Sequence, residues 1–477
     1  MMSEPKRLHP AAIFFNFIRV MREALFAIIL GFITFKDEGF LYFILGASGL
    51  TILFLVFSIW SWFRYTYRIE DDELRIEYGI FIRKKRYISK NRIQSIDLTS
   101  SVVHRIFKLT RVQIETAGSS TGAEASLKAV KLAEGEALRD ELKSTRGQLT
   151  EVEEESTDET KTYPSQMIKF KRLFIAGSTS GSIGVIFALL AFGFSELEQF
   201  IPDHYYDNTV EWVIGLSIVL MISLAVVTLL LLWLLGIAGT MIKYGKFTIT
   251  KYENELFITR GLLEKKQLTI PLNRIQAVGI EESLIRQPLG YVTLYAEVAG
   301  GSLDKGEDFS SVLFPILKAD EVEEFLNTFL PEYTGIRQEL TPLPKRARKF
   351  YITRSVLPFL VLAVAVWFIF PQLIWVPVFL LAVSLYLGIL RHKDGGFQQD
   401  GKQLTIRFRT FSRNTIIMYH KRIQAFEKKQ HRVHVKTGLA TMRLSIIGKM
   451  GMGKHFTIKE LEESHTDQLA DWYSYRD

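Results

Sequence analysis

Six long apolar runs, arranged in three pairs, restrict the fold of this 477-residue chain more than any other feature. Most of them approach the roughly 20 residues that an α-helix needs to cross the hydrocarbon core of a bilayer. The sequence therefore predicts three transmembrane helical hairpins. The runs cover about residues 13–35, 40–63, 173–194, 210–242, 355–370 and 372–390.

The first run differs from the others because Arg19 and Arg22 interrupt it. Its uninterrupted part covers only about 18 Å as a helix that rises 1.5 Å per residue. Two interpretations stay open. Either the two arginines reach back to the membrane interface, or the first part of the run lies along the membrane surface.

The distribution of charge predicts the orientation of the hairpins. The connections inside the three pairs hold one basic residue, Lys36, and nearly all other Lys and Arg residues fall on the opposite side. The positive-inside rule assigns this opposite side, with both chain termini, to the cytoplasm. We therefore expect a multipass protein whose larger polar segments are cytoplasmic.

The composition excludes several classes of protein. Because the chain has no cysteine, it has no disulfide, thiolate nucleophile, iron–sulfur cluster or cysteine-based zinc site. We interpret its net charge of +8 as a sign of contact with anionic lipid, and we expect no nucleic acid partner. Apart from Arg19, Arg22 and Glu23 in the first run and Glu211 at the very start of the fourth, the apolar runs contain no Asp, Glu, Lys, Arg or His, which disfavours a transporter.

The polar segments are three copies of one sequence pattern. The stretches KNRIQSI, LNRIQAV and HKRIQAF align the copies without a gap over residues 73–118, 255–300 and 403–448. Alternating apolar and polar residues predict roughly seven short strands in each copy, and an amphipathic helix closes it. The expected fold class is α+β, with three repeats of a transmembrane helical hairpin followed by a small β-barrel or sandwich and a C-terminal helix.

This pattern of strands and closing helix, with the internal RIQ, the G-L-x-T/V strand and the TAG turn, resembles the bacterial pleckstrin-homology (PH) domains of type two. The resemblance covers the chain except for the acidic linker around residues 146–160. It implies a PH-like fold in each repeat and a location in the bacterial cytoplasmic membrane. The third copy departs from the pattern, because Lys421 replaces Asn and Arg409 stands where the other copies have Gly79 and Gly261.

The repeats divide the chain into eight segments. We expect hairpins at 1–63, 165–243 and 347–392, PH-like domains at 64–145, 244–331 and 393–477, an acidic linker at 146–164 and a second linker at 332–346.

Basic residues of the PH-like domains are candidate contacts with the inner leaflet. Each basic side chain near an anionic membrane surface contributes about 1 kcal/mol of attraction. Specific headgroup binding and diffuse attraction that orients the domain are the alternatives. The candidates are Arg83, Lys84, Lys85, Arg86, Lys265, Lys266, Lys428 and Lys429.

The RIQ motif gives a second set of candidates. Arg donates up to five hydrogen bonds and Gln both donates and accepts, so the pair either ties down neighbouring backbone carbonyls or forms a docking surface between domains. These residues are Arg92, Gln94, Arg274, Gln276, Arg422 and Gln424. In the third apolar run, Gly177 and Gly181 have the spacing that lets helices approach closely.

We predict no catalytic, cofactor or metal site. The stretch GKMGMGKH at 448–455 lacks the Ser or Thr and the following helix of a phosphate-binding loop, so we interpret it as a strand-connecting loop. The acidic stretch SLDKGED lacks the ligand spacing of a calcium loop. His431 and His434 have no accompanying carboxylate motif, and we expect them to be solvated.

The expected function is that of a non-enzymatic membrane scaffold. Its PH-like domains would assemble at the inner leaflet with each other, with a smaller homologous PH-domain membrane protein, or with both. The family resemblance implies a role in envelope protection or in resistance to membrane-active peptides. The alternatives are a transporter or channel component formed by oligomerised hairpins, and a sensor that binds anionic lipid.

Overall fold

The computed structural model describes residues 4–34, 40–116, 124–147, 163–180, 218–300, 311–335, 340–448 and 453–474. They belong to two compact units, Met1–Thr162 with Leu263–Pro271 and Tyr163–Leu262 with Leu272–Asp477. The short segment Leu263–Pro271 is therefore part of the first unit, although the residues on both sides of it in the sequence belong to the second.

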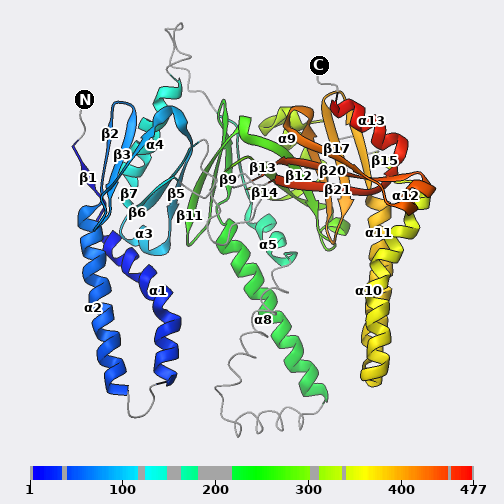
Figure 1. Cartoon of the computed structure of the whole chain (residues 1–477), viewed down its shortest axis with the longest axis horizontal. Coiled ribbons are helices and arrows are strands. Elements are labelled where there is room, and N and C mark those ends of the chain that lie inside the picture. The colour runs from blue at the N-terminus through cyan, green and yellow to red at the C-terminus, as the bar shows by residue number, and fades with distance from the viewer. Residues whose placement is uncertain are drawn as a thin grey trace. The chain divides into compact units, whose positions relative to one another are not determined.

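Pairs of apolar helices form where the sequence predicts hairpins (Figure 1). Four described segments are long and apolar enough to cross a membrane, namely Phe40–Arg64, Ile222–Tyr244, Lys345–Ile369 and Pro371–Asp394. The helices are α1 (Ala11–Thr34) with α2 (Phe40–Arg64), α5 (Phe170–Ser178) with α8 (Ile218–Tyr244), and α10 (Arg348–Ile369) with α11 (Trp375–Asp394).

Helix α1 is not among the four candidate spans, and it carries Arg19, Arg22 and Glu23. It is nevertheless one continuous helix of 24 residues. Most of the third predicted apolar run and the start of the fourth lie outside the described residues.

In the described residues, each hairpin is followed by six strands and a closing helix, and the first and third repeats add the short helices α3 (Val102–Ile106) and α12 (Arg432–Thr437). The first repeat has β2 (Thr66–Glu70), β3 (Glu73–Tyr78), β4 (Lys84–Ser89), β5 (Ile93–Ser100), β6 (Leu109–Thr116), β7 (Ala125–Lys131) and α4 (Leu132–Gly147). The second has β9 (Thr248–Lys251), β10 (Glu255–Arg260), β11 (Lys265–Pro271), β12 (Ile275–Glu282), β13 (Tyr291–Val298), β14 (Ser311–Lys318) and α9 (Val322–Phe329). The third has β16 (Gly396–Asp400), β17 (Gln403–Arg409), β18 (Arg413–Tyr419), β19 (Ile423–Lys429), β20 (Leu439–Ile447), β21 (Gly453–Glu462) and α13 (Glu463–Ser474). The predicted α+β class with three repeats is confirmed.

A further short strand precedes each hairpin. Strands β1 (Lys6–Arg7), β8 (Ser165–Met167) and β15 (Thr341–Pro342) pair antiparallel with β2, β9 and β16, the first strands after the hairpins. Each hairpin is thus inserted between two neighbouring strands of its own β-domain. The segments 1–63 and 165–243, which we assigned to hairpins, and the linker 332–346 therefore each contain one strand of a β-domain.

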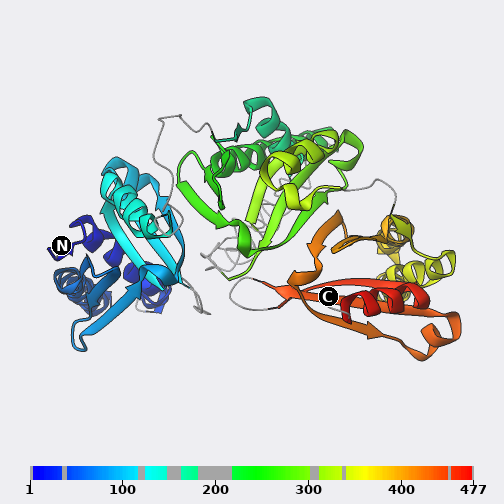
Figure 2. The same ribbon diagram turned by 90° about the horizontal axis from the view of Figure 1, so that it is seen from above.

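The hydrophobic pattern explains how each repeat closes around its core. In α9 the buried residues Val322, Phe325, Leu326 and Phe329 recur at the spacing of one helix face. In the third repeat Leu404 and Ile406 of β17 share one core cluster with Leu469 of α13. Figure 2 shows α13, in red, lying across β19–β21.

Candidate docking site between repeats

The RIQ motif has the same local structure in all three repeats. A single 3₁₀ turn comes first, at Lys90–Arg92, Leu272–Arg274 and His420–Arg422. The isoleucine of the motif then begins β5, β12 or β19. Ile93, Ile275 and Ile423 are buried in all three copies, so the isoleucine anchors the strand in its own core.

The polar residues of the motif differ in burial from copy to copy. Gln94 is half-buried, Gln276 is buried and Gln424 is exposed. The amide nitrogens of Gln276 and Gln424 donate to the carbonyls of Arg274 and Arg422, at 3.1 and 3.5 Å. These amides therefore tie the turn to the strand that follows it. The difference in burial comes from what covers each strand.

The strand after the first RIQ is covered by the second repeat. Strand β5 pairs antiparallel with β11, with Ser100, Thr99 and Leu98 opposite Lys265, Lys266 and Gln267. The backbone N–H of Thr269 donates to Asp97 Oδ1 at 3.0 Å, and Arg139 of α4 donates to Gln267 Oε1 at 3.4 Å. This junction explains why Leu263–Pro271 belongs to the first unit.

The strand after the second RIQ is covered by the third repeat in the same way. Strand β12 pairs antiparallel with β18, and the register sets Ile280 opposite Thr415 and Glu282 opposite Arg413. Leu98 and Ile280 occupy the same position in their repeats, and so do Gln267 and Thr415. The two junctions therefore have the same register. One rule of strand pairing joins each repeat to the next.

Side chains strengthen the second junction. Arg413 Nε donates to Glu282 Oε1 at 3.0 Å, and Lys454 Nζ lies 3.2 Å from Oε1 of the buried Glu297. The hydroxyl of Tyr295 donates to Asn414 Oδ1 at 3.4 Å, and burial raises the pKa of Tyr295 far above its usual value. The phenol stays neutral and keeps its proton for this hydrogen bond.

Arg409, which replaces a glycine of the other repeats, has a defined role at this junction. Its buried guanidinium pairs with Asp394 at the end of α11 and donates to Gln287 of the second repeat. It also donates to the carbonyl of Phe411 at 3.0 Å. The departure in the third copy thus adds a contact that joins its hairpin, its own β-domain and the preceding repeat.

The predicted lipid contacts divide into three groups. Several already have acidic partners, since Arg83 and Lys85 pair with Glu77, and Lys429 lies 3.0 Å from Glu427. Hydrogen bonds to Asp467 and Glu463 raise the pKa of Lys428. Lys265 and Lys266 lie in the first junction, opposite Ser100 and Thr99. Lys84 and Arg86 are exposed on β4, where Arg86 donates to the carbonyl of Glu124.

Apolar loop tips beside the hairpins are a feature that we did not predict. After each hairpin, the chain forms one strand, turns, and forms a second strand that runs back toward the membrane helices. The turn after this second strand lies beside the end of a helix. At this second turn Phe81 is 84% exposed, and its ring centroid lies 6.0 Å from that of Trp60 in α2. Leu262 donates its N–H to the carbonyl of Ile242 in α8 at 2.9 Å. The sequence signal that could have identified these tips is a pair of large apolar residues in a turn shortly before two basic residues.

A third repeated contact fixes each β-domain to its first helix. His104, Arg286 and His434 share one position in the aligned windows. The ring of His104 stacks on Phe15 of α1 at 3.9 Å, and the ring of His434 lies edge-on to Phe350 of α10 at 5.4 Å. The guanidinium of Arg286 donates to the carbonyl of Ala176 in α5 at 3.0 Å.

Burial lowers the pKa values of His104 and Arg286. We expected His431 and His434 to be solvated. This expectation is wrong for His434, because its side chain packs between α10 and β21. The sequence showed only scattered histidines, and the alignment did not reveal that one repeat position contacts a helix each time.

Gly177 of α5 lies directly against Ile237 of α8. A Cβ atom at this residue would come within 2.9 Å of the Cα atom of Ile237. Any larger residue would force the two helices apart. Gly181, its predicted companion, lies outside the described residues.

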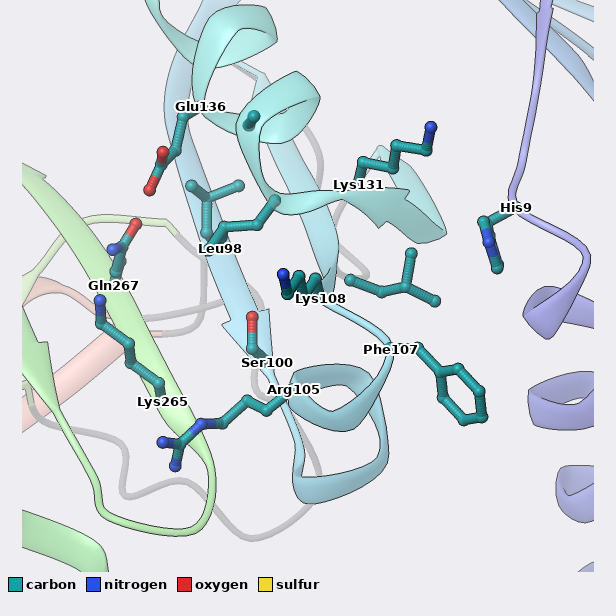
Figure 3. A pocket seen from close by; sticks show the side chains of 13 residues that line it. His9, Leu98, Ser100, Arg105, Phe107, Lys108, Lys131, Glu136, Lys265 and Gln267 are labelled. Atoms are coloured by element: carbon teal, nitrogen blue, oxygen red, sulfur yellow. The ribbon is translucent and has the colours of Figure 1, made fainter.

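One cavity lies beside the first junction. It has a volume of about 710 Å³ and is lined by Leu98, Leu109 and Leu132, among others. Four basic residues also line it, namely Arg105, Lys108, Lys131 and Lys265. Figure 3 shows Arg105 and Lys265 on the same side of the cavity, near Ser100. Its volume is in the range of pockets that bind small molecules.

The fold and this site define a class: a membrane protein built from repeats of a PH-type β-domain that pair with one another through strands. The bacterial PH domain model matches residues 14–146, 204–332 and 353–477, and the chain belongs to this family. It is also 36% identical, over 490 aligned positions, to the UPF0699 transmembrane protein YdbT of Bacillus subtilis (strain 168). That alignment covers 100% of this chain and 99% of the relative. No solved structure matches the chain.

Proposed function

We propose that this chain is a non-enzymatic, multipass scaffold of the bacterial cytoplasmic membrane. Its PH-type repeats would lie on the cytoplasmic side, with both termini, and assemble at the inner leaflet. Their partners would be a smaller homologous PH-domain membrane protein, other copies of the chain, or both. Protection of the envelope against membrane-active peptides is the cellular role that we propose for the assembly.

The observation that carries this proposal is the strand pairing between repeats in one register. β5 with β11, and β12 with β18, use the outer edges of β-domains to join neighbours. Main-chain hydrogen bonds at sheet edges are a common means of protein assembly. A chain that links its own domains by this rule has the parts that a scaffold needs.

The apolar tips support a position of the repeats against the membrane. Phe81 and Ile82 are exposed beside α2, and Arg83, Lys84, Lys85 and Arg86 follow them. Apolar residues flanked by basic residues suit the boundary between headgroups and acyl chains. Fully burying a Phe or Ile side chain contributes about 1.5–3 kcal/mol, so the tips would hold the β-domain against the leaflet more firmly than charge alone.

This position can be tested with a fluorescent label. Because the chain has no cysteine, Phe81→Cys provides one attachment site for bimane in the full chain reconstituted in lipid. We expect strong quenching of bimane by lipids that carry a spin label just below the headgroup. Asp71→Cys, in the turn between β2 and β3, is the matched control and should show little quenching. Equal quenching at the two sites would argue against contact between the tips and the membrane.

A second candidate function, binding of an anionic lipid, is favoured by the cavity beside the first junction. Apolar residues at the wall and basic residues around it suit a molecule with an acyl chain and an anionic headgroup. Reversal of charge at Arg105, Lys108 and Lys131, which line the cavity and lie outside the strand pairing, should then abolish binding to anionic liposomes. Unchanged binding would exclude the sensor.

The scaffold itself is tested in the native membrane. After gentle detergent extraction, the chain should run as an assembly larger than a monomer and should carry other membrane proteins identifiable by mass spectrometry. Cells lacking the chain should become more sensitive to membrane-active peptides. Recovery of a lone monomer would contradict the scaffold, and unchanged sensitivity would contradict the protective role.

A further inference from the structure

The pairing rule leaves one sheet edge open in the first repeat. At the two junctions, the strand that precedes RIQ receives a strand from the preceding repeat: β11 receives β5, and β18 receives β12. The equivalent strand of the first repeat is β4. Within the described part of the chain, β4 pairs with β3 on one side and ends its sheet on the other.

The exposure of equivalent residues also distinguishes β4 from β11 and β18, whose outer edges are paired. Tyr87 of β4 is 55% exposed, whereas Thr269 of β11 is 5% exposed and Ile417 of β18 is fully buried. Across β4, Lys84 to Tyr87 are all exposed. An unpaired strand edge of this kind is a ready template for another strand. The strand β4 therefore has the form of a receiving strand with no donor strand among the described residues.

The charges on β4 select the kind of donor. In the register of the two junctions, the residue facing Lys84 is equivalent to Thr99 and Glu281, and the residue facing Arg83 is equivalent to Ser100 and Glu282. Both junctions thus set hydroxyl or acidic residues at these positions. β4 carries more positive charge than β11 or β18, so the preference for acidic residues is stronger.

A second copy of this chain is a poor donor for β4. The strand that a second copy could donate is β19, which follows the third RIQ and ends the sheet β19-β20-β21 among the described residues. In the same register, Lys429 would face Lys84 and Lys428 would face Lys85. Like charges directly opposite each other destabilise a strand pair. Glu427 would face Arg86, and this residue already lies 3.0 Å from Lys429.

We propose that the outer edge of β4 receives a strand from a different polypeptide that carries a PH-type repeat, with acidic residues opposite Arg83 and Lys84. This inference rests on the proposed scaffold function and names the edge through which one partner joins. The donor is the strand that follows the RIQ position of the partner's repeat. Lysines on both open edges prevent the chain from pairing with itself.

A cysteine cross-link tests this edge with a probe from the chain itself. The probe is a peptide of residues 273–284, with cysteine in place of Val278, whose Glu281 and Glu282 would face Lys84 and Arg83. The target is the full chain with Tyr87→Cys, where Tyr87 would lie opposite the peptide cysteine. At low salt, with the peptide cysteine activated as a mixed disulfide with thionitrobenzoate so that the Tyr87→Cys thiolate displaces that leaving group, we expect this peptide to form a disulfide about tenfold faster than a peptide with both glutamates changed to lysine.

A matched control uses the covered strand. Thr269→Cys, at the equivalent position of β11, should form little adduct with either peptide because β5 already occupies that edge. Reaction of the Tyr87→Cys thiol with a small maleimide shows that the thiol is accessible, and an unchanged circular dichroism spectrum shows that the variant is folded. Equal rates for the acidic and basic peptides, or no adduct at an accessible thiol, would overturn the proposal.

A cross-link between copies would also overturn it. The variant with Tyr87→Cys and Phe426→Cys should form no disulfide-linked dimer under oxidation, because β19 does not pair with β4 of another copy. Disulfide-linked dimers and longer ladders would show instead that the chain is its own partner. Neither result depends on the size of native assemblies or on peptide sensitivity, so the open edge and the scaffold function can fail separately.

Discussion

Arg409→Met is expected to destabilise the third repeat by about 3–5 kcal/mol, the loss typical of removing one partner of a buried ion pair. The guanidinium of Arg409 is fully buried, and the side chain of Asp394 is 9% exposed. The variant leaves this carboxylate with Arg413, whose Nη1 lies 3.6 Å away. It also removes the hydrogen bond to Gln287 in the second repeat. Hydrogen exchange of the β17 and β18 amides should accelerate.

The charge on Asp394 provides the control for this result. Adding Asp394→Asn to the Arg409→Met variant removes the carboxylate that has lost its nearer cation and should restore part of the lost protection. Arg432→Met, which changes an exposed arginine in the same repeat, should leave exchange in β17 and β18 unchanged. If Arg409→Met exchanges at the original rate, the buried pair does not stabilise the junction.

The repeat and the alignment of its three copies could be predicted from the sequence. In the structure the three RIQ segments begin equivalent strands at Ile93, Ile275 and Ile423. Alternation along a strand reports which face is buried, and this predicted the β-domain. It does not report which edge is covered or by what. Pairing of β12 with β18 depends on contacts between distant segments, which single-strand patterns do not contain.

The strands before the hairpins were missed for a different reason. β1 and β15 have two residues each, too few to show alternation, and each is separated from its partner by a complete hairpin. The same distance in sequence hid the contacts of His104 and Arg286 with the first helices. His104 lies in the short helix α3 and Arg286 in a turn, and only the packed structure brings them to Phe15 and Ala176.

The structure also changes the meaning of the basic residues. From the sequence, Lys265 and Lys266 were equivalent to Lys84 and Lys85 as contacts with the leaflet. In the structure the first pair lies in a strand junction, and the second lies on an edge with no donor among the described residues. Basic pairs on equivalent strands therefore serve a closed junction in one copy and lie on an exposed strand in another.

Arg354→Leu is expected to loosen the third hairpin from its β-domain, with a loss of about 3 kcal/mol for an arginine removed from a buried carboxylate. Glu460 of β21 is fully buried, and Arg354 of α10 pairs with it through both carboxylate oxygens. The remaining neighbour is His434, whose Nε2 lies 3.6 Å from Glu460 Oε1. Because an isolated carboxylate is costly to bury, β21 should open more often.

Hydrogen exchange of the β21 amides in the full chain measures this opening. Adding Glu460→Gln to Arg354→Leu replaces the charge by a neutral amide of the same size, so protection should largely return. Glu460→Gln alone should cost less than Arg354→Leu, because it leaves the cation half-exposed in solvent and no charge buried. If the double variant opens as readily as Arg354→Leu, the loss comes from packing against Tyr351 and not from the carboxylate.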